Sequence, residues 1–182
     1  MALVVEPCPL DGLLLIRPSI FADHRGYFYE SYSDKDYRAA GIEADFVQDN
    51  QSFSKKGVLR GLHFQNPPHA QAKLVRVTSG AVYDVAVDLR PGSLTFGRYF
   101  GVELNDANQL QFFIPRGFAH GFLVLSASAI FQYKCDEYYH PSSESGLRYN
   151  DPAVGIEWPD PGVPIEISTK DLRLPLLKDL KT

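Results

Sequence analysis

The sequence is poor in cysteine, and its two thiols suggest neither a metal site nor a disulfide framework. The 2 cysteines, Cys8 and Cys135, lie far apart in the chain. Cysteine-based zinc sites need closely spaced pairs, and this chain offers none. A disulfide between the two has no support, and reduced thiols are typical of a cytosolic protein. We therefore expect free cysteines and a cytoplasmic location.

Basic charge and long hydrophobic runs are also scarce. The formal net charge is −4, whereas general nucleic-acid binders normally carry a basic excess. No apolar run reaches the roughly 18 residues of a membrane-spanning helix, and the apolar start of the chain breaks off too early for a signal peptide. We expect no nucleic-acid partner and no membrane segment. A local basic cluster can still bind an anionic small molecule.

Three common active-site motifs are missing. The chain has no Walker loop, no Gly-x-Gly-x-x-Gly segment and no Gly-x-Ser-x-Gly elbow. These absences remove the simple interpretations of nucleotide hydrolysis, dinucleotide binding and serine hydrolysis.

What the sequence has in abundance is short segments of β-branched and aromatic residues. Aromatic residues make up 13% of the chain, with 10 Tyr and 12 Phe, which is ample bulk for a β core. Turn-forming residues separate the segments. Their composition predicts strands at residues 13–17, 26–32, 46–53, 58–64, 73–77, 81–89, 99–104, 111–114, 120–125 and 129–134.

The strand expected at residues 81–89 has two different faces. One face carries Asp84 and Asp88 together with Val82 and Ala86. We expect the opposite face to lie in the core, because it consists of Tyr83, Val85, Val87 and Leu89.

Helical signals are few. Ser33 or Asp34 can cap a helix that continues through residues 36–40 and ends at Gly41. A second short turn is expected to begin at Ser168, with Asp171 as a capping-box-like partner.

The pattern predicts one all-β domain that spans residues 1–182. About nine or ten short strands with turns between them favour a jelly-roll barrel. After residue 139 the chain becomes rich in proline, which predicts an irregular C-terminal tail laid over the barrel.

Residues 58–65 (VLRGLHFQ) set an arginine and a histidine in an otherwise apolar strand. Burial of a charged group is costly without a partner, so such residues point to a polar pocket. Arg60 and His63 fall on opposite faces of an ideal strand. Either a bulge near Gly61 brings them together, or they serve different places. The plain alternative is a core histidine satisfied by a carboxylate and a surface arginine.

Other candidates are weaker by themselves. Histidines in β-barrels often bind metals, but no second histidine lies two residues after His63, and a metal centre is disfavoured. A lone tyrosine such as Tyr133 is usually an amphipathic packing residue. The polar segments 23–26 and 48–50 are moderate pocket candidates or plain turns.

Taken together, the residues resemble the dTDP-4-dehydrorhamnose 3,5-epimerase family of the cupin superfamily. The resemblance covers nearly the whole chain in order, at residues 21–30, 46–50, 58–65, 71–77, 84–90, 114–125, 133–134, 155–159 and 168–171. It implies a cupin-type jelly roll that inverts carbons 3 and 5 of dTDP-4-dehydro-6-deoxy-D-glucose to make dTDP-4-dehydro-L-rhamnose, a precursor of dTDP-L-rhamnose.

The resemblance also implies catalytic roles. His63 matches the base that removes a proton beside the 4-keto group, and its ordinary pKa of about 6.5 suits that task. Asp171 matches the carboxylate that orients this imidazole. Lys73 matches the cation beside the enolate oxygen. Tyr133 matches the proton donor on the far face of the sugar.

Binding roles are implied in the same way. The matching substrate-binding positions are Arg25, Glu30, Gln48, Asn50, Arg60, His120, Tyr139, Glu144 and Lys170. Family members need no metal or organic cofactor. They are homodimers with exchanged N-terminal strands, so Arg25 and Glu30 are expected to serve the neighbouring subunit's pocket.

Three alternatives remain open at the level of sequence. A relative that inverts only carbon 3 or only carbon 5 would share the catalytic residues. A non-catalytic cupin that binds a nucleotide sugar would not need a base opposite an acid. A metal-dependent cupin enzyme is the third.

Overall fold

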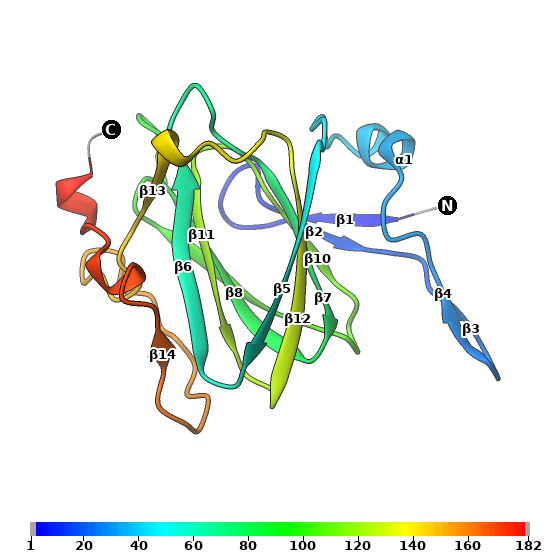
Figure 1. Ribbon diagram of the computed structural model, residues 1–182. Coiled ribbons are helices and arrows are strands. Elements are labelled where there is room, and N and C mark those ends of the chain that lie inside the picture. Colours follow the sequence, from blue (N-terminus) through cyan, green and yellow to red (C-terminus); the bar gives the residue numbers. More distant parts are fainter. Residues whose placement is uncertain (1–2, 181–182) are drawn as a thin grey trace.

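The structure is a computed structural model that describes residues 3–180. Two six-stranded sheets face each other, as a jelly roll requires (Figure 1). In spatial order, the first sheet consists of β1 (Val4–Pro7), β2 (Leu14–Arg17), β10 (Gln111–Ile114), β7 (Lys73–Ser79), β12 (Ser128–Cys135) and β5 (Gln48–Lys55). The second consists of β13 (Glu144–Gly146), β6 (Val58–Gln65), β11 (Phe118–Val124), β8 (Ala81–Asp88) and β9 (Tyr99–Asn105), with β14 (Glu166–Ile167) parallel to β6.

The all-β prediction is confirmed, with corrections at the N-terminal end. The segment expected at 26–32 ends early, because β4 (Gly26–Phe28) pairs only with β3 (Phe21–Asp23). That hairpin projects from the body of the molecule (Figure 1). The strands β1 and β3 escaped prediction, and so did the short strands β13 and β14 in the C-terminal tail.

Helices are short, as expected. The one α-helix of residues 3–180, α1 (Asp34–Ala39), begins at the N-cap Ser33, whose Oγ accepts a hydrogen bond from the Asp36 amide. Three 3-10 turns follow late in the chain: η1 (Pro141–Ser143), η2 (Asp171–Arg173) and η3 (Leu177–Asp179). In the described part of the chain, no helix is long and apolar enough to cross a membrane.

The main core lies between the two sheets, and a second core lies outside β8. Val82 and Ala86 pack in the main core. Val85 and Val87 are equally buried, but they pack against Trp158 and other residues of the C-terminal tail. The sequence prediction that the apolar face of residues 81–89 lies in a core is confirmed for Val85, Val87 and Leu89, although this core lies outside the barrel. Alternation identifies two faces, but it cannot reveal that a distant segment covers the outer one.

A bulge at Gly61 decides where the side chains of β6 point. The pairing of β6 with β11 shifts register between His120 and Phe122. Gly61 has φ +112°, and a Cβ there would lie 2.7 Å from the His120 carbonyl oxygen. Only glycine tolerates this backbone and this close approach. As a result Arg60 and His63, three residues apart, line the same cavity, so the bulge alternative is confirmed.

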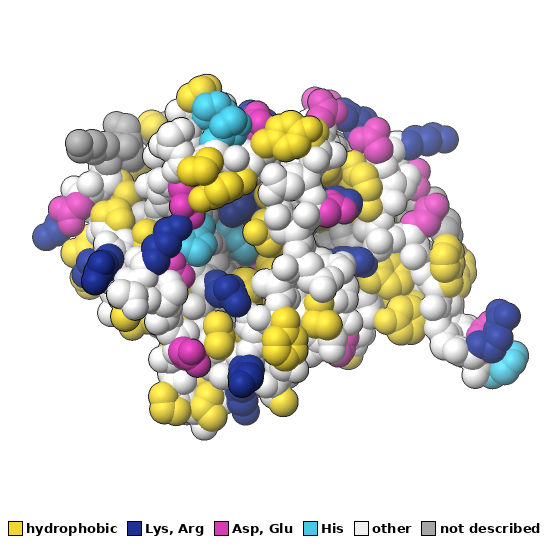
Figure 2. All heavy atoms as spheres, in the orientation of Figure 1, with side chains coloured by type: hydrophobic (Ala, Val, Ile, Leu, Met, Phe, Trp, Pro, Cys, Tyr) yellow, Lys and Arg dark blue, Asp and Glu magenta, His cyan; other side chains and the backbone are white. Residues whose placement is uncertain are grey.

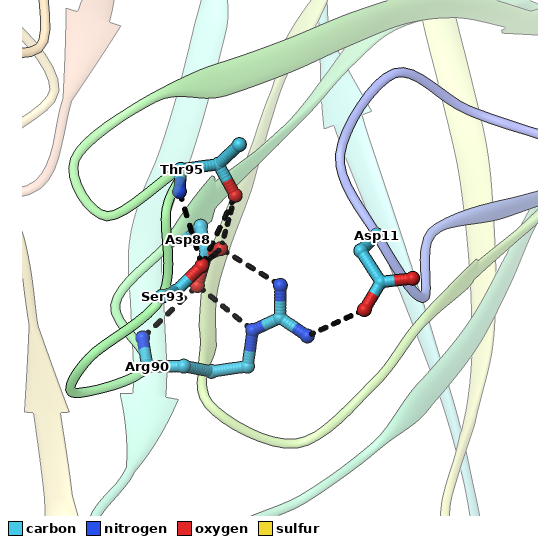
Figure 3. Close-up of polar contacts among 5 residues, drawn as sticks. All are labelled: Asp11, Asp88, Arg90, Ser93 and Thr95. Carbon is cyan, nitrogen blue, oxygen red and sulfur yellow. Dashed lines mark hydrogen bonds and ion pairs between the residues drawn. The ribbon is translucent and has the colours of Figure 1, made fainter.

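A buried carboxylate stabilises the loop between β8 and β9 through hydrogen bonds (Figure 3). Asp88 is fully buried, and its oxygens accept hydrogen bonds from Arg90 Nε (2.9 Å), Ser93 Oγ (2.6 Å) and Thr95 Oγ1 (2.7 Å). Burial alone would raise the pKa of Asp88, but these hydrogen bonds outweigh it and hold the pKa well below its usual range. The cluster anchors the loop that follows the central strand β8.

Replacing Gly61 by alanine should destabilise the fold. Positive φ and a backbone clash each cost about 1–3 kcal/mol, so we expect a loss of roughly 3 kcal/mol. For a chain of this size that lowers the melting temperature by about 6–12 °C, measured by thermal unfolding. Gly92→Ala is the control, because Gly92 also has positive φ (+77°) but no other atom lies within 4 Å of the place its Cβ would take. Equal losses in the two variants would contradict the role of close packing at Gly61.

Asp88→Asn should also destabilise the protein. The amide nitrogen of asparagine cannot accept the hydrogen bonds that one carboxylate oxygen of Asp88 accepts, so buried donors would lose their acceptor. We expect a loss on the order of 3 kcal/mol at pH 7. The folded pKa is depressed, so the stabilisation by Asp88 is present above the unfolded pKa of about 3.9 and is lost as pH falls. In denaturant titrations, the difference in the free energy of unfolding between Asp88→Asn and the original protein should narrow below pH 4. The exposed Asp160 provides the control Asp160→Asn, and an equal loss there would refute the prediction.

Candidate active site

A cavity opens between the two sheets and has two adjoining compartments. Figure 2 shows a hollow beside β6 where histidine and basic side chains gather. The larger compartment, about 460 Å³, is lined by Ser52, Val58, Leu59, Arg60, His63, Lys73, His120, Gly121, Phe122, Phe131, Tyr133, Glu166, Ile167, Ser168, Lys170 and Asp171. The smaller compartment, about 240 Å³, is lined by Gln48, Asn50, His63, Phe64, Gln65, Gln71, Lys73, Tyr133, Cys135, Tyr139 and Glu144. His63, Lys73 and Tyr133 line both.

His63 and Asp171 form a hydrogen-bonded pair at the wall made by β6. Asp171 begins η2 and is 4% exposed, and its amide donates to Ser168 Oγ at 3.0 Å, as the expected capping interaction requires. His63 Nε2 lies 2.8 Å from Asp171 Oδ1. The other oxygen, Oδ2, accepts from the Gly61 amide at 3.1 Å. A neutral His63 that donates through Nε2 has its lone pair on Nδ1, which is then a base.

Burial and charge act in opposite directions on His63. Burial lowers the pKa of His63, while the hydrogen bond to Asp171 and the charge of this carboxylate raise it. Burial prevails, so the pKa lies below 6.5. The imidazole is therefore neutral near pH 7 and ready to accept a proton.

Lys73 and Tyr133 face His63 from the opposite sheet. Lys73 is the first residue of β7, Tyr133 lies on β12, and Lys73 Nζ is 5.9 Å from the centre of the tyrosine ring. Burial lowers the pKa of Lys73. Burial raises the pKa of Tyr133 above its usual 10, so the phenol keeps its proton at neutral pH. A base on one wall thus faces a proton donor and a cation on the other.

A second histidine–carboxylate pair lies at the floor of the larger compartment. His120 Nε2 is 3.0 Å from both carboxylate oxygens of Asp84, which is fully buried. The family resemblance marks His120 as a ligand-contacting position, but sequence reasoning missed Asp84 as its partner. A carboxylate inside the apolar segment 81–89 was the available signal, because a buried acid needs a partner.

The remaining binding candidates divide between the compartments. Arg60 Nε donates to Ser54 Oγ at 2.9 Å. Glu144, which lines the smaller compartment, links two other binding candidates. It accepts hydrogen bonds from Lys170 Nζ at 2.7 Å and from the Tyr139 hydroxyl at 3.0 Å. The hydrogen bond from Lys170 lowers the pKa of Glu144.

Gln48 and Asn50 connect β5 to the loop that carries Tyr139. Gln48 Oε1 accepts from the Tyr139 amide at 3.1 Å, and Gln48 Nε2 donates to Asn50 Oδ1 at 3.0 Å. The backbone of this loop is therefore held against the strand, although the Tyr139 ring itself is exposed.

Arg25 and Glu30 do not reach the cavity of their own chain. Arg25 lies at the tip of the β3–β4 hairpin, with 79% of its side chain exposed and an ion pair to Asp23 at 2.6 Å. Glu30 lies beside α1 in a separate small pocket with Leu3 and Pro18. Neither residue lines the larger or the smaller compartment.

The thiols and the possible metal ligands bear on two expectations, free cysteines and a disfavoured metal centre. Cys8 and Cys135 are both free, as expected. Within residues 3–180 there is no group of three or more His, Cys, Asp or Glu side chains that could hold a metal ion. Both cavity histidines are instead bonded to carboxylates.

Comparison with known proteins identifies the family. The sequence model of the dTDP-4-dehydrorhamnose 3,5-epimerase family matches residues 7–179. The chain belongs to this family. It is 51% identical over 172 residues to the dTDP-4-dehydrorhamnose 3,5-epimerase of Escherichia coli, an alignment that covers 94% of this chain and 92% of the relative.

Solved structures agree with this assignment. The epimerase of Legionella pneumophila, solved in complex with dTDP-4-keto-L-rhamnose, superposes with a TM-score of 0.95 at 50% identity and covers 99% of this chain and 95% of that one. A 3'-monoepimerase from Streptomyces bikiniensis, solved in complex with dTDP-quinovose, superposes with a TM-score of 0.88 at 34% identity, covering 94% and 87%. The family therefore includes relatives of both kinds.

The His63 imidazole should titrate below pH 6.5, because burial outweighs the carboxylate. NMR of the ring protons across a pH series measures this directly. In Asp171→Asn the pKa should fall further, since the substitution removes the group that raises it. Asp160→Asn should leave the His63 titration unchanged. A His63 pKa above 6.5, or an upward shift in Asp171→Asn, would contradict this balance.

Proposed function

We propose that this protein inverts carbons 3 and 5 of dTDP-4-dehydro-6-deoxy-D-glucose and so produces dTDP-4-dehydro-L-rhamnose. The observation that carries the proposal is a single cavity with His63 and Asp171 on one wall and Lys73 and Tyr133 on the other. Family membership and the product-like ligand in the Legionella structure support the choice of substrate.

The chemistry begins with proton removal beside the ketone. The hydrogens on carbons 3 and 5 are acidic, because the electrons left behind delocalise onto the oxygen of carbon 4. His63 Nδ1 accepts the proton, while Asp171 holds the ring and stabilises the imidazolium that forms. Lys73 stabilises the enolate oxygen, where negative charge develops in a site shielded from water.

Inversion requires that the new proton arrive on the opposite face of the ring. Tyr133 supplies it from β12, because the tyrosine keeps its proton at neutral pH. Before the second inversion His63 releases its proton to solvent and Tyr133 takes one up from solvent, so that two such cycles invert both carbons. The reaction moves protons and leaves the oxidation state of the sugar unchanged, so the proposal includes no cofactor.

Binding follows from the division of the cavity. Arg60, His120 and Lys170 would hold the sugar and pyrophosphate in the larger compartment, since guanidinium and ammonium groups suit phosphate oxygens. Gln48, Asn50, Tyr139 and Glu144 would contact the thymidine in the smaller one.

We also propose a homodimer with exchanged N-terminal strands. In such a dimer Arg25 and Glu30 would enter the partner's cavity. The exposed aromatic residues Phe21, Tyr27 and Phe28 on the projecting hairpin support a surface covered by another copy. The free thiols are typical of a cytosolic protein, which supports a cytoplasmic location.

A single-carbon epimerase is the second candidate. The similarity to the Streptomyces 3'-monoepimerase favours it, and the same catalytic residues would serve. The difference would lie in whether the ring can reorient to present its second proton to His63.

Incubation with dTDP-4-dehydro-6-deoxy-D-glucose in deuterated water tests the proposal. We expect deuterium at carbons 3 and 5, located by NMR, and the L-configured product, trapped with a reductase. His63→Ala should lose about 10²–10⁴-fold in deuterium incorporation. Tyr133→Phe should retain exchange through His63 but lose a similar factor in inverted product.

Tyr83→Phe is the matched control, because Tyr83 packs against Trp158 outside the barrel. This substitution should leave the rates of deuterium incorporation and of product formation unchanged. Deuterium at one carbon only would establish the single-carbon alternative. No incorporation, or full turnover by His63→Ala, would overturn the proposed function.

A further inference from the structure

The Tyr139 ring is exposed, but the backbone that carries it is held by glutamine side chains at residues 138–140. The residue is 52% exposed and lines the smaller compartment. Gln48 accepts from the Tyr139 amide. Gln65 bonds the residues on either side, because its Nε2 donates to the Tyr138 carbonyl oxygen at 3.1 Å and its Oε1 accepts from the His140 amide at 2.6 Å. Residues 138–140 lie in neither a strand nor a helix, so these side chains satisfy backbone groups that regular structure would otherwise pair.

Gln65 uses both of its amide hydrogens within the protein. Its Nε2 also donates to the His69 carbonyl oxygen at 2.6 Å, and the side chain is 5% exposed. Two carbonyl oxygens beside Nε2 fix the orientation of the amide, because a flipped amide would bring its oxygen against both of them. Gln65 therefore lines the smaller compartment but has no donor left for a ligand.

The same side chain joins two loops to the end of β6. His69 lies in the loop between β6 and β7, and His140 lies in the loop that follows β12. Their imidazole rings stack with centroids 3.6 Å apart and planes inclined by 20°. His69 Nδ1 also lies 2.9 Å from Ser143 Oγ. Gln65 is the last residue of β6, so the loop that carries Tyr139 is attached to a strand of the barrel.

We propose that Gln65 is a positioning residue that holds Tyr139 ready for the nucleotide, an inference that rests on the proposed function. A ring that is fixed before binding loses less conformational freedom when a planar base packs against it. Gln65 acts through the backbone on both sides of Tyr139 and does not itself bind the nucleotide. The loop is therefore ordered during folding rather than during binding.

Loss of this positioning should weaken nucleotide binding and leave the chemical step intact. Gln65→Met keeps the length of the side chain but removes the amide. The Kd for dTDP, measured by calorimetry, should rise roughly 3- to 10-fold, the effect of ordering one side chain and its loop on binding. KM for the 4-keto substrate should rise by a similar factor, whereas kcat should stay within about twofold.

A double-mutant cycle tests whether Gln65 acts through Tyr139. Tyr139→Ala removes the ring, and by itself it should raise the Kd for dTDP roughly 5- to 150-fold, the range for loss of one contact between a base and an aromatic ring. In the Tyr139→Ala background, Gln65→Met should raise the Kd by less than about twofold, because the two residues act as one unit.

Gln111→Met is the matched control for the loss of a buried glutamine. Gln111 is 1% exposed, accepts from the Tyr37 hydroxyl at 2.8 Å and donates to the Ser31 carbonyl oxygen at 2.8 Å. It lines neither compartment. Both methionine variants should lower the melting temperature, but only Gln65→Met should weaken dTDP binding. Gln65→Asn, whose amide is one methylene short, provides the same comparison if Gln65→Met does not fold.

Multiplying effects of Gln65→Met and Tyr139→Ala would overturn the inference, because Gln65 would then act on the nucleotide without Tyr139. An unchanged Kd for dTDP in Gln65→Met, or an equal rise in Gln111→Met, would overturn it too. Failure of the proposed function is distinguishable, since it would appear as absent deuterium incorporation in the unsubstituted protein, whatever its affinity for dTDP.

Discussion

The bulge at Gly61 is the constraint on which the site depends. In a regular strand Arg60 and His63 would point to opposite sides of the sheet. The positive φ of Gly61 and its contact with the backbone of His120 and Gly121 bring both into one cavity. The same irregularity turns the Gly61 amide toward Asp171, which also bonds His63. One backbone feature thus positions His63, the carboxylate of Asp171 and the guanidinium of Arg60, to which the proposed function assigns its base, its orienting group and a binding group.

Burial between the two sheets then adjusts the proton affinities. Removal of water lowers the pKa values of His63 and Lys73 and raises that of Tyr133. One physical cause therefore favours a neutral base on β6 and a protonated phenol on β12. Asp171 moderates the effect on His63, because its carboxylate favours the imidazolium form and so raises the pKa.

Most strands were predictable because their signals are local, whereas the catalytic candidates were named through the family resemblance. The segments near β6, β7 and β12 have β-forming composition, and Ser33 caps α1 as its position suggested. The partner of His120 and the cover of the outer face of β8 were not predicted. Asp84 is 36 residues from His120 along the chain, and the tail that covers β8 follows long after it. The segment that covers the outer face of β8 was not predicted for this reason.

The sequence by itself determined the class of the fold, the family and the residue types available for proton transfer. The fold class follows from composition and alternation along the chain, and the family follows from the resemblance to its known members. Only the tertiary structure decided which of these residues meet. It joined His120 to Asp84, laid the C-terminal tail over the outer face of β8, and left the Ser52 hydroxyl unpaired. Contacts between distant segments depend on sheet register and packing, which no local pattern encodes.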